Sequence, residues 1–370
     1  MIAPERLYNF LQQEGISFYT GVPDSLMKNF TGYLQDNCSE DRHIITANEG
    51  LAVALASGYY FQTGKMPLVY LQNSGLGNVV NPLTSLADRE MYQVPMLLLI
   101  GWRGRPGVKD EPQHHKMGRI TVKLLEALEV PVYLVDADES TAFERISEAI
   151  RLAEEKQMPV ALLVQEQLFE SHKSVELADD YKLERESVIQ KIIDVLQGDE
   201  TVICTTGKTG REFYEQNITA GNKIKKYLLS AGAMGHANHI ALGVKIATDR
   251  KVIMLDGDGA LIMHLGALPA ITHYAKEKFI HVLLNNGSHE SVGGQPTEAY
   301  RIDCCAIAIA CGYDQVICIK NENELERWLH DELKRDTVQF VEIRINRNSR
   351  SDLGRPVGKP ADWKNNFMSS

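Results

Sequence analysis

Short runs of apolar and β-branched residues alternate along the chain with stretches whose apolar residues recur at helical spacing. Several of the short runs are apolar throughout, such as VPMLLLI at residues 94–100 and MPVALLV at 158–164. A strand of this kind is buried on both faces, as in a parallel sheet covered by helices. The alternation therefore predicts an α/β protein built from doubly wound parallel sheets.

The pattern assigns approximate bounds to the elements. Strands are expected at residues 16–19, 44–45, 67–71, 95–100, 132–135, 159–164, 201–204, 227–229, 252–255, 280–284, 315–319 and 339–343. Helices are expected at 1–15, 24–34, 49–62, 79–88, 121–128, 141–155, 187–196, 237–247, 265–274, 306–311 and 322–333.

One polar stretch interrupts this rhythm. Residues 166–186 (EQLFESHKSVELADDYKLERE) have no apolar period, which is typical of a linker. We expect a first domain at 1–168, a linker at 169–186 and a second domain at 187–346. The tail at 347–370 is expected to be an extended or partly ordered arm. The length of 370 residues suits two domains.

Composition narrows the range of functions. The chain carries 49 acidic and 39 basic residues, a net charge of −10, which disfavours nucleic acid and membrane surfaces as partners. An anionic substrate would therefore need a local basic cluster. The six cysteines follow no metal-binding spacing and are expected to be reduced thiols of a cytoplasmic protein. Neither a membrane span nor a signal peptide is expected.

The most informative motifs lie in the second half. Gly257-Asp258-Gly259 ends one expected strand, and Asn286-Gly287-Ser288 follows the next, with Asp258 and Asn286 28 positions apart. Strand ends on one rim of a parallel sheet bring such residues together, and carboxylate and amide oxygens suit Mg²⁺ or Ca²⁺. The flanking glycines give backbone N–H groups access to phosphate oxygens. Each motif alone is also typical of a turn.

These two motifs resemble the fingerprint of the thiamin diphosphate enzyme family. The resemblance implies thiamin diphosphate as cofactor and Mg²⁺, or Ca²⁺ or Mn²⁺, as its metal. It makes Asp258 and Asn286 side-chain ligands and Ser288 a carbonyl ligand. It also gives Gly257 and Gly259 a place beside the diphosphate.

Two further segments are similar to the same family. In Ala231-Gly232-Ala233-Met234-Gly235 the resemblance implies that Gly232 accepts a hydrogen bond from the aminopyrimidine and that Met234 wedges the cofactor, although a lone methionine is usually a core residue. In residues 47–52 (ANEGLA), it implies that Glu49 binds the pyrimidine and assists its proton transfer. By itself, Glu49 equally fits a helix first-turn acid.

The two halves account for nearly all of the sequence, so a third domain of the kind that many relatives carry is not expected. Among compact members, residues 21–25, 72–78, 101–105, 110–114 and 285–291 resemble the phosphonopyruvate decarboxylases and, as a related group, the sulfopyruvate decarboxylases. The resemblance implies a carboxy-lyase that converts 3-phosphonopyruvate to phosphonoacetaldehyde and CO₂ in phosphonate biosynthesis. Among enzymes, the first alternative is a sulfopyruvate decarboxylase that gives sulfoacetaldehyde, and a carboligase is a weaker one. From other classes, the alternatives are a non-enzymatic Mg²⁺–nucleotide module and a non-catalytic regulatory subunit of the same fold.

A basic segment supplies the local cluster that an anionic substrate needs. Residues 101–119 follow an expected strand, so we expect them on a strand-end rim as a loop. Arginine holds a phosphonate in a bidentate pair, although a solvated loop has the same composition. The expected substrate-binding residues are Ser25, Arg103, Arg105, Lys109, His114, His115 and Glu290.

Asp24 and His114 are the candidates for proton transfer, and Asp24 also suits the N-cap of its helix. The expected partner is a small anionic 2-oxo acid. The family resemblance further implies a homodimer or larger homo-oligomer, with the active site at a subunit interface.

Overall fold

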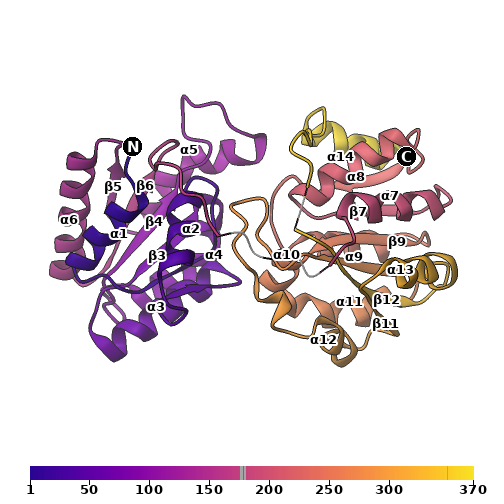
Figure 1. The fold of residues 1–370 in the computed structure, drawn as a ribbon, viewed down its shortest axis with the longest axis horizontal. Coiled ribbons are helices and arrows are strands. Elements are labelled where there is room, and N and C mark those ends of the chain that lie inside the picture. Colours follow the sequence, from indigo (N-terminus) through magenta and orange to yellow (C-terminus); the bar gives the residue numbers. More distant parts are fainter. Residues whose placement is uncertain (176–177, 179–180, 348) are drawn as a thin grey trace. The chain divides into compact units, whose positions relative to one another are not determined.

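The computed structural model describes residues 1–175, 178, 181–347 and 349–370, and it divides into two compact units (Figure 1). We call Met1–Glu176 the N-terminal unit and Leu177–Ser370 the C-terminal unit. The expected linker and arm include residues 176–177, 179–180 and 348, which lie outside the described residues.

The N-terminal unit is a six-stranded parallel sheet in the order β2-β1-β3-β4-β6-β5. Its strands are β1 (Tyr19–Gly21), β2 (His43–Ile45), β3 (Leu68–Gln72), β4 (Met96–Gly101), β5 (Val132–Val135) and β6 (Pro159–Val164). Its helices are α1 (Pro4–Gln13), α2 (Lys28–Asn37), α3 (Glu49–Thr63), α4 (Leu76–Pro82), α5 (Pro112–Ala127) and α6 (Glu139–Lys156).

Alternate residues of β3 and β4 enter different cores. Leu97 and Leu99 pack against α1, α2 and α6, whereas Leu98 and Ile100 pack against α3, α4 and α5. Burial on both faces explains why these strands read as continuous apolar runs.

The C-terminal unit is a second six-stranded parallel sheet, in the order β11-β12-β10-β9-β7-β8. Its strands are β7 (Thr201–Cys204), β8 (Lys226–Leu229), β9 (Val252–Gly257), β10 (Phe279–Asn285), β11 (Gln315–Ile319) and β12 (Val338–Arg344). Its helices are α7 (Arg185–Val195), α8 (Lys208–Thr219), α9 (Ala237–Lys245), α10 (Asp258–Met263), α11 (Leu268–Ala275), α12 (Cys304–Cys311), α13 (Glu322–Arg327) and α14 (Pro360–Ser369).

The two sheets share one topology. Read in reverse and counted from β7, the second order repeats the first. Helices cover both faces of each sheet, so the predicted α/β class with two doubly wound sheets is confirmed. In both units, strands are added toward one edge of the sheet and then toward the other, and the change occurs between the first and third strands. Folds of this kind bind ligands at such a point, beyond the carboxyl ends of the strands.

Two expectations about helices are corrected. Helix α5 begins at Pro112 instead of residue 121, because proline suits the first helical turn; much of the expected basic loop is therefore helical. Helix α8 was not expected, since its apolar positions are sparse. The tail contains α14, which opens with Pro360 and a capping box. Among the described residues, no helix combines the length and apolarity that a bilayer span needs.

Candidate active site

The two oxygen-bearing motifs of the C-terminal unit meet at neighbouring strand ends. Leu284 of β10 pairs with Gly257 of β9, so Asp258 and Asn286 emerge side by side. Both side chains are buried. Burial raises the Asp258 pKa to about 6, although Thr297 and the Asn286 backbone N–H donate to the carboxylate and act in the opposite direction. A cation against this carboxylate would remove the penalty of burying its charge.

A tight turn shapes the loop after β10. The Asn286 Oδ1 atom accepts from the backbone N–H of Ser288 at 3.1 Å, and the Ser288 hydroxyl donates to the Gly294 carbonyl at 3.1 Å. Gly287 has φ = +62°, and a Cβ there would lie 2.8 Å from the Tyr300 ring. Only glycine fits this position without displacing the ring.

A buried ion-pair network lies behind Asn286. The Asn286 amide donates to Glu290 at 3.1 Å, and Arg185 and Lys208 each donate to Glu290 at 2.8 Å. Arg185 also forms a bidentate pair with Glu212, at 2.7 and 2.8 Å. Burial raises the Glu290 pKa, but Arg185 and Lys208 outweigh it and hold that pKa below its ordinary value. Both Glu290 oxygens are thus engaged within the unit, and its substrate contact stays a prediction.

A second buried network supports the turn after β9. One Asp256 oxygen accepts from the Gly257 backbone N–H at 2.9 Å, and the other lies 3.0 Å from His281 Nε2. The His281 Nδ1 atom lies 3.1 Å from the Tyr313 hydroxyl. The sequence did not point to this network, because Asp256, His281 and Tyr313 come from three separate strand regions.

The candidate wedge residue lies beside the metal motif. A Cβ on Gly259 would lie 3.0 Å from the Met234 terminal methyl and 3.1 Å from His289 Cε1. The Gly232 carbonyl accepts from the Ser230 hydroxyl at 2.6 Å. His289 is buried, which lowers its pKa to about 4 and keeps the imidazole neutral. Sequence reasoning missed His289 as a neighbour of this site.

In the N-terminal unit, Glu49 is the first residue of α3. The Asn48 side chain caps the helix, and the buried Glu49 carboxylate accepts from the Asn78 amide at 2.6 Å. A Cβ on Gly75 would lie 2.3 Å from Glu49 Oε1, so glycine is needed there. Glu49 therefore has one oxygen fixed by Asn78 and a conformation fixed by its surroundings.

Asp24 is fully buried after β1. It accepts from the Leu26 backbone N–H at 2.9 Å and from the Gln72 amide at 2.6 Å. Burial raises its pKa, even though these bonds act in the opposite direction. Helix α2 begins at Lys28, so the expected N-cap role of Asp24 is wrong; it heads an Asx turn before the helix instead.

The basic segment is partly neutralised from within. Arg103 donates to both oxygens of Asp110, at 2.8 and 2.5 Å, and to the Ser25 hydroxyl at 2.7 Å. Burial raises the Asp110 pKa, but Arg103 and the Gly104 and Glu111 backbone N–H groups outweigh it and hold that pKa well below its ordinary value. Arg103 is therefore already paired with an internal carboxylate.

The other predicted substrate residues of this unit lie along the same segment. Arg105 donates to Gln165, and the His115 Nε2 atom lies 2.7 Å from the Asp110 carbonyl. His114 is half-buried in α5, and Lys109 is exposed before it. Ser25 and Arg103 also line a pocket of about 400 Å³, together with Met1, Leu26, Lys28, Asn29, Glu166, Gln167 and Phe169.

The C-terminal residues fit a divalent metal ion and a diphosphate. The donor set consists of a carboxylate, an amide oxygen and backbone carbonyls, which are the hard ligands that Mg²⁺ prefers. A buried carboxylate of raised pKa and glycines at both turns agree with a bound cation and closely approaching phosphate oxygens.

Comparisons with known proteins match both units. The N-terminal TPP binding domain of thiamine pyrophosphate enzymes matches residues 1–124, and the C-terminal TPP binding domain matches residues 211–343. The chain is 33% identical to a phosphonopyruvate decarboxylase of Streptomyces viridochromogenes, over 100% of this chain and 95% of the relative. A phosphonopyruvate decarboxylase of Streptomyces hygroscopicus is 31% identical, over 99% and 93%.

A more distant relative is named for a different substrate, sulfopyruvate. A sulfopyruvate decarboxylase of Methanosarcina acetivorans is 26% identical, over 83% of this chain and 82% of the relative. The two higher identities and the two matching domains agree with the site geometry described above. The chain therefore belongs to the thiamin diphosphate-dependent decarboxylases, in the family of the phosphonopyruvate decarboxylases.

Proposed function

We propose that this chain decarboxylates 3-phosphonopyruvate to phosphonoacetaldehyde and CO₂, as a Mg²⁺-dependent enzyme of phosphonate biosynthesis. The observation that carries the proposal is the match along nearly its whole length to two phosphonopyruvate decarboxylases. The juxtaposition of Asp258 and Asn286 at one rim supports it.

We assign the metal and the cofactor to the following residues. Asp258, Asn286 and the Ser288 carbonyl would hold Mg²⁺, or Ca²⁺ or Mn²⁺ in its place. Gly257, Gly259, Gly232 and Met234 would contact thiamin diphosphate. When bound, this cofactor supplies the electron sink that CO₂ loss requires.

The protein's own contribution to proton transfer begins with Glu49. Its carboxyl group is proposed to hydrogen-bond the cofactor's pyrimidine, and Asn78 fixes the orientation of that carboxyl. Asp24 and His114 are proposed to handle the proton that the product carbon takes up. The raised pKa of buried Asp24 suits a proton donor, because a larger share of it is protonated near neutral pH than of an exposed aspartate.

The substrate's second anion is proposed to meet the basic segment of the N-terminal unit. Its candidate contacts are Ser25, Arg103, Arg105, Lys109, His114 and His115. Because Arg103 is paired with Asp110, we expect it to orient Ser25 and the segment as well as to attract the anion. Lys109 is exposed and adds positive charge nearby.

The test is CO₂ release from phosphonopyruvate, sulfopyruvate and pyruvate, each with thiamin diphosphate and Mg²⁺ supplied. We expect the highest kcat/KM with phosphonopyruvate. Sulfopyruvate decarboxylation, which the Methanosarcina acetivorans relative favours, predicts the highest value with sulfopyruvate. A highest value with pyruvate would contradict a role for the basic segment, and no turnover of any substrate would favour a regulatory subunit.

The role of Glu49 is tested by Glu49→Gln. The glutamine retains an oxygen for the Asn78 amide, so the fold and cofactor binding should persist. Loss of proton transfer should lower kcat by about 10²–10⁴-fold. Cofactor binding, measured by calorimetry, separates this effect from loss of the site, and an unchanged rate would contradict the assignment.

A further inference from the structure

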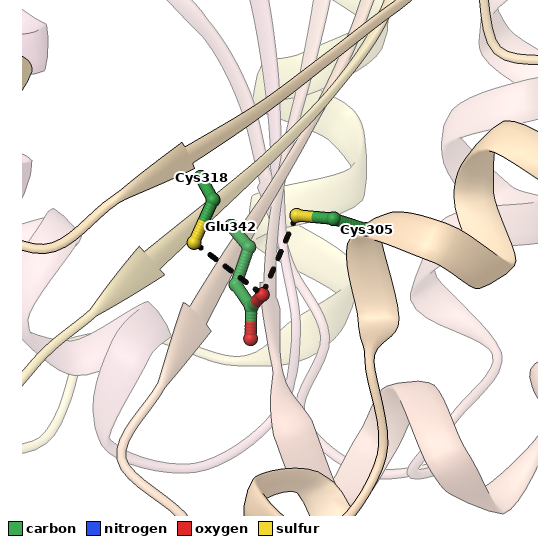
Figure 2. Close-up of side chains that lie close together, drawn as sticks. All are labelled: Cys305, Cys318 and Glu342. Atoms are coloured by element: carbon green, nitrogen blue, oxygen red, sulfur yellow. Dashed lines mark hydrogen bonds between the residues drawn. The ribbon is translucent and has the colours of Figure 1, made fainter.

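Two thiols and a carboxylate converge at the edge of the C-terminal sheet, on elements that carry none of the candidate metal ligands described above. Figure 2 shows Cys305 reaching from α12, Cys318 from β11 and Glu342 from β12. Cys318 and Glu342 are direct partners in the strand register, so they share one face of the sheet. The two Sγ atoms and one Glu342 oxygen lie within 4.8 Å of one another.

The spacing of these atoms matches the ligand shell of a thiophilic cation. Glu342 Oε2 lies 3.5 Å from Cys305 Sγ and 3.9 Å from Cys318 Sγ. With metal bonds of about 2.3 Å to sulfur and about 2.0 Å to oxygen, a tetrahedral Zn²⁺ ion separates sulfur from oxygen by about 3.5 Å. Both sulfur–oxygen distances therefore lie within a few tenths of an ångström of the value for a shared ion, and the two Sγ atoms lie within 4.8 Å of each other.

The carboxylate is held ready for this contact. Its other oxygen, Oε1, accepts from the Asn285 amide at 2.7 Å and from Arg344 at 2.8 Å. Oε2 is thereby left facing the two thiols. Glu342 itself is buried, whereas Cys318 is exposed on the edge strand, which gives an ion a path from solvent.

A simpler arrangement, in which both thiols donate hydrogen bonds to Glu342, agrees with the same distances. What favours a metal is the ligand type. Two sulfur atoms and one carboxylate oxygen select Zn²⁺ over Mg²⁺, and three protein ligands leave a fourth position for water. The sequence spacing did not indicate the site, since residues 305, 318 and 342 meet only through the sheet.

We propose that Cys305, Cys318 and Glu342 bind one Zn²⁺ ion, separate from the metal site at Asp258. Binding releases the two thiol protons to solvent and forms two Zn–S bonds and one Zn–O bond. The ion would connect β11, the edge strand, to α12 and β12. Since the folded chain alone assembles the three ligands, Zn²⁺ should raise the thermal unfolding midpoint.

The experiment is a Co²⁺ titration of the reduced full-length protein, with Mg²⁺ and thiamin diphosphate present. Wild type should take up one equivalent with a near-ultraviolet thiolate-to-cobalt absorption band, and Zn²⁺ should then abolish the band. Cys305→Ser and Cys318→Ser should lose the band and the Zn²⁺-dependent rise in midpoint. Cys311→Ser, on the same helix α12, should retain both.

Two results would overturn the proposal. One is a wild-type protein without the band at one equivalent of Co²⁺. The other is a band of equal strength in Cys318→Ser. Unfolding midpoints measured without metal identify a variant that has failed to fold, and Cys318→Ala then replaces Cys318→Ser. Decarboxylation is assayed under the same conditions. The Zn²⁺ proposal does not require this activity to change, so the failure of one proposal can be told from the failure of the other.

Discussion

Glycines at strand ends give the buried carboxylates of the N-terminal unit their space. A Cβ on Gly101 would lie 2.1 Å from Asp24 Oδ1, and one on Gly75 would lie 2.3 Å from Glu49 Oε1. Neither glycine requires a positive φ, so the constraint is close approach and not backbone conformation. The position of each of these functional carboxylates therefore depends on the glycine beside it.

Gly101→Ala should therefore displace the Asp24 carboxyl group. We expect a loss of about 1–3 kcal/mol in the free energy of unfolding, because overpacking a buried site forces neighbours to shift. Gly243→Ala is the matched control: Gly243 lies in α9, nothing approaches its Cβ position within 4 Å, and the change should stabilise by about 0.5–1 kcal/mol. Urea unfolding measures both; equal effects would contradict the steric explanation.

His43 makes the stability depend on pH. Its ring is buried beside the Tyr70 hydroxyl, at 2.8 Å, and burial lowers its pKa to about 4. The unfolded chain takes up this proton near pH 6.5, so the unfolded state binds more protons between about pH 6.5 and 4. Neutral His43 contributes fully to the free energy of unfolding above about pH 6.5. This contribution, on the order of 3 kcal/mol in total, is lost as the pH falls toward 4.

We expect His43→Gln to reduce this dependence, because glutamine keeps a hydrogen-bonding group but does not titrate. Urea unfolding of wild type and variant at pH 7.5 and 5 measures the difference. His273→Gln, at an exposed position, should leave the wild-type dependence unchanged. A His43→Gln variant with the full wild-type slope would show that another group is responsible.

At the scale of elements, one buried arginine joins two helices to the loop after β10. Arg185 opens α7, Glu212 lies in α8, and Glu290 follows Asn286 in the loop. The Arg185 and Glu212 side chains are only 7% and 1% exposed, so each charge depends on its partner and not on water for stabilisation. The network therefore holds the loop that carries the candidate metal ligands.

Arg185→Leu should destabilise the protein by about 3–5 kcal/mol, because it leaves Glu212 buried without its partner. The double variant Arg185→Leu/Glu212→Leu should recover much of this loss, since both buried charges are then absent. Urea unfolding of wild type, both single variants and the double variant gives the coupling free energy. If the double variant is as unstable as Arg185→Leu, packing and not charge is the cause.

The bounds of the helices and strands show which elements the hydrophobic pattern predicts accurately. Strands β5, β6, β7 and β11 have the predicted bounds, because each is a short, mostly apolar run that ends at a polar residue. Strand β1 lies three residues after its predicted start, and α5 begins nine residues early. The start of α5 depends on Pro112 and on its Gly118 packing against the Gly104 carbonyl, a contact between residues fourteen positions apart.

At the scale of the whole molecule, α3 keeps an apolar surface. Leu51 is 57% and Phe61 53% exposed, although their helix is apolar on every side. A helix of this kind is normally buried, which agrees with the homodimer or larger homo-oligomer that the family resemblance implies. The net charge of −10 also keeps long-range attraction of an anion weak, so binding depends on local cations.

We expect sedimentation velocity to show at least a dimer, and Leu51→Asp to shift it toward monomer because a charge cannot be buried unpaired. Val357→Asp, at a 79% exposed position outside the helices, should leave assembly unchanged. Circular dichroism checks that both variants fold. A fully active wild-type monomer would contradict the proposed assembly.

The sequence by itself determined the fold class, the two-part organisation and the motifs around Glu49, Asp258 and Asn286, because periodicity and strand-end spacing are local properties of the chain. Only the tertiary structure decided which groups these residues contact. Asn78 on Glu49, Gln72 on Asp24, and the meeting of Cys305, Cys318 and Glu342 all join residues that parallel strands and their crossovers bring together. Hydrogen bonds and ion pairs act over a few ångströms, and that distance is set by the sheet and not by separation along the chain.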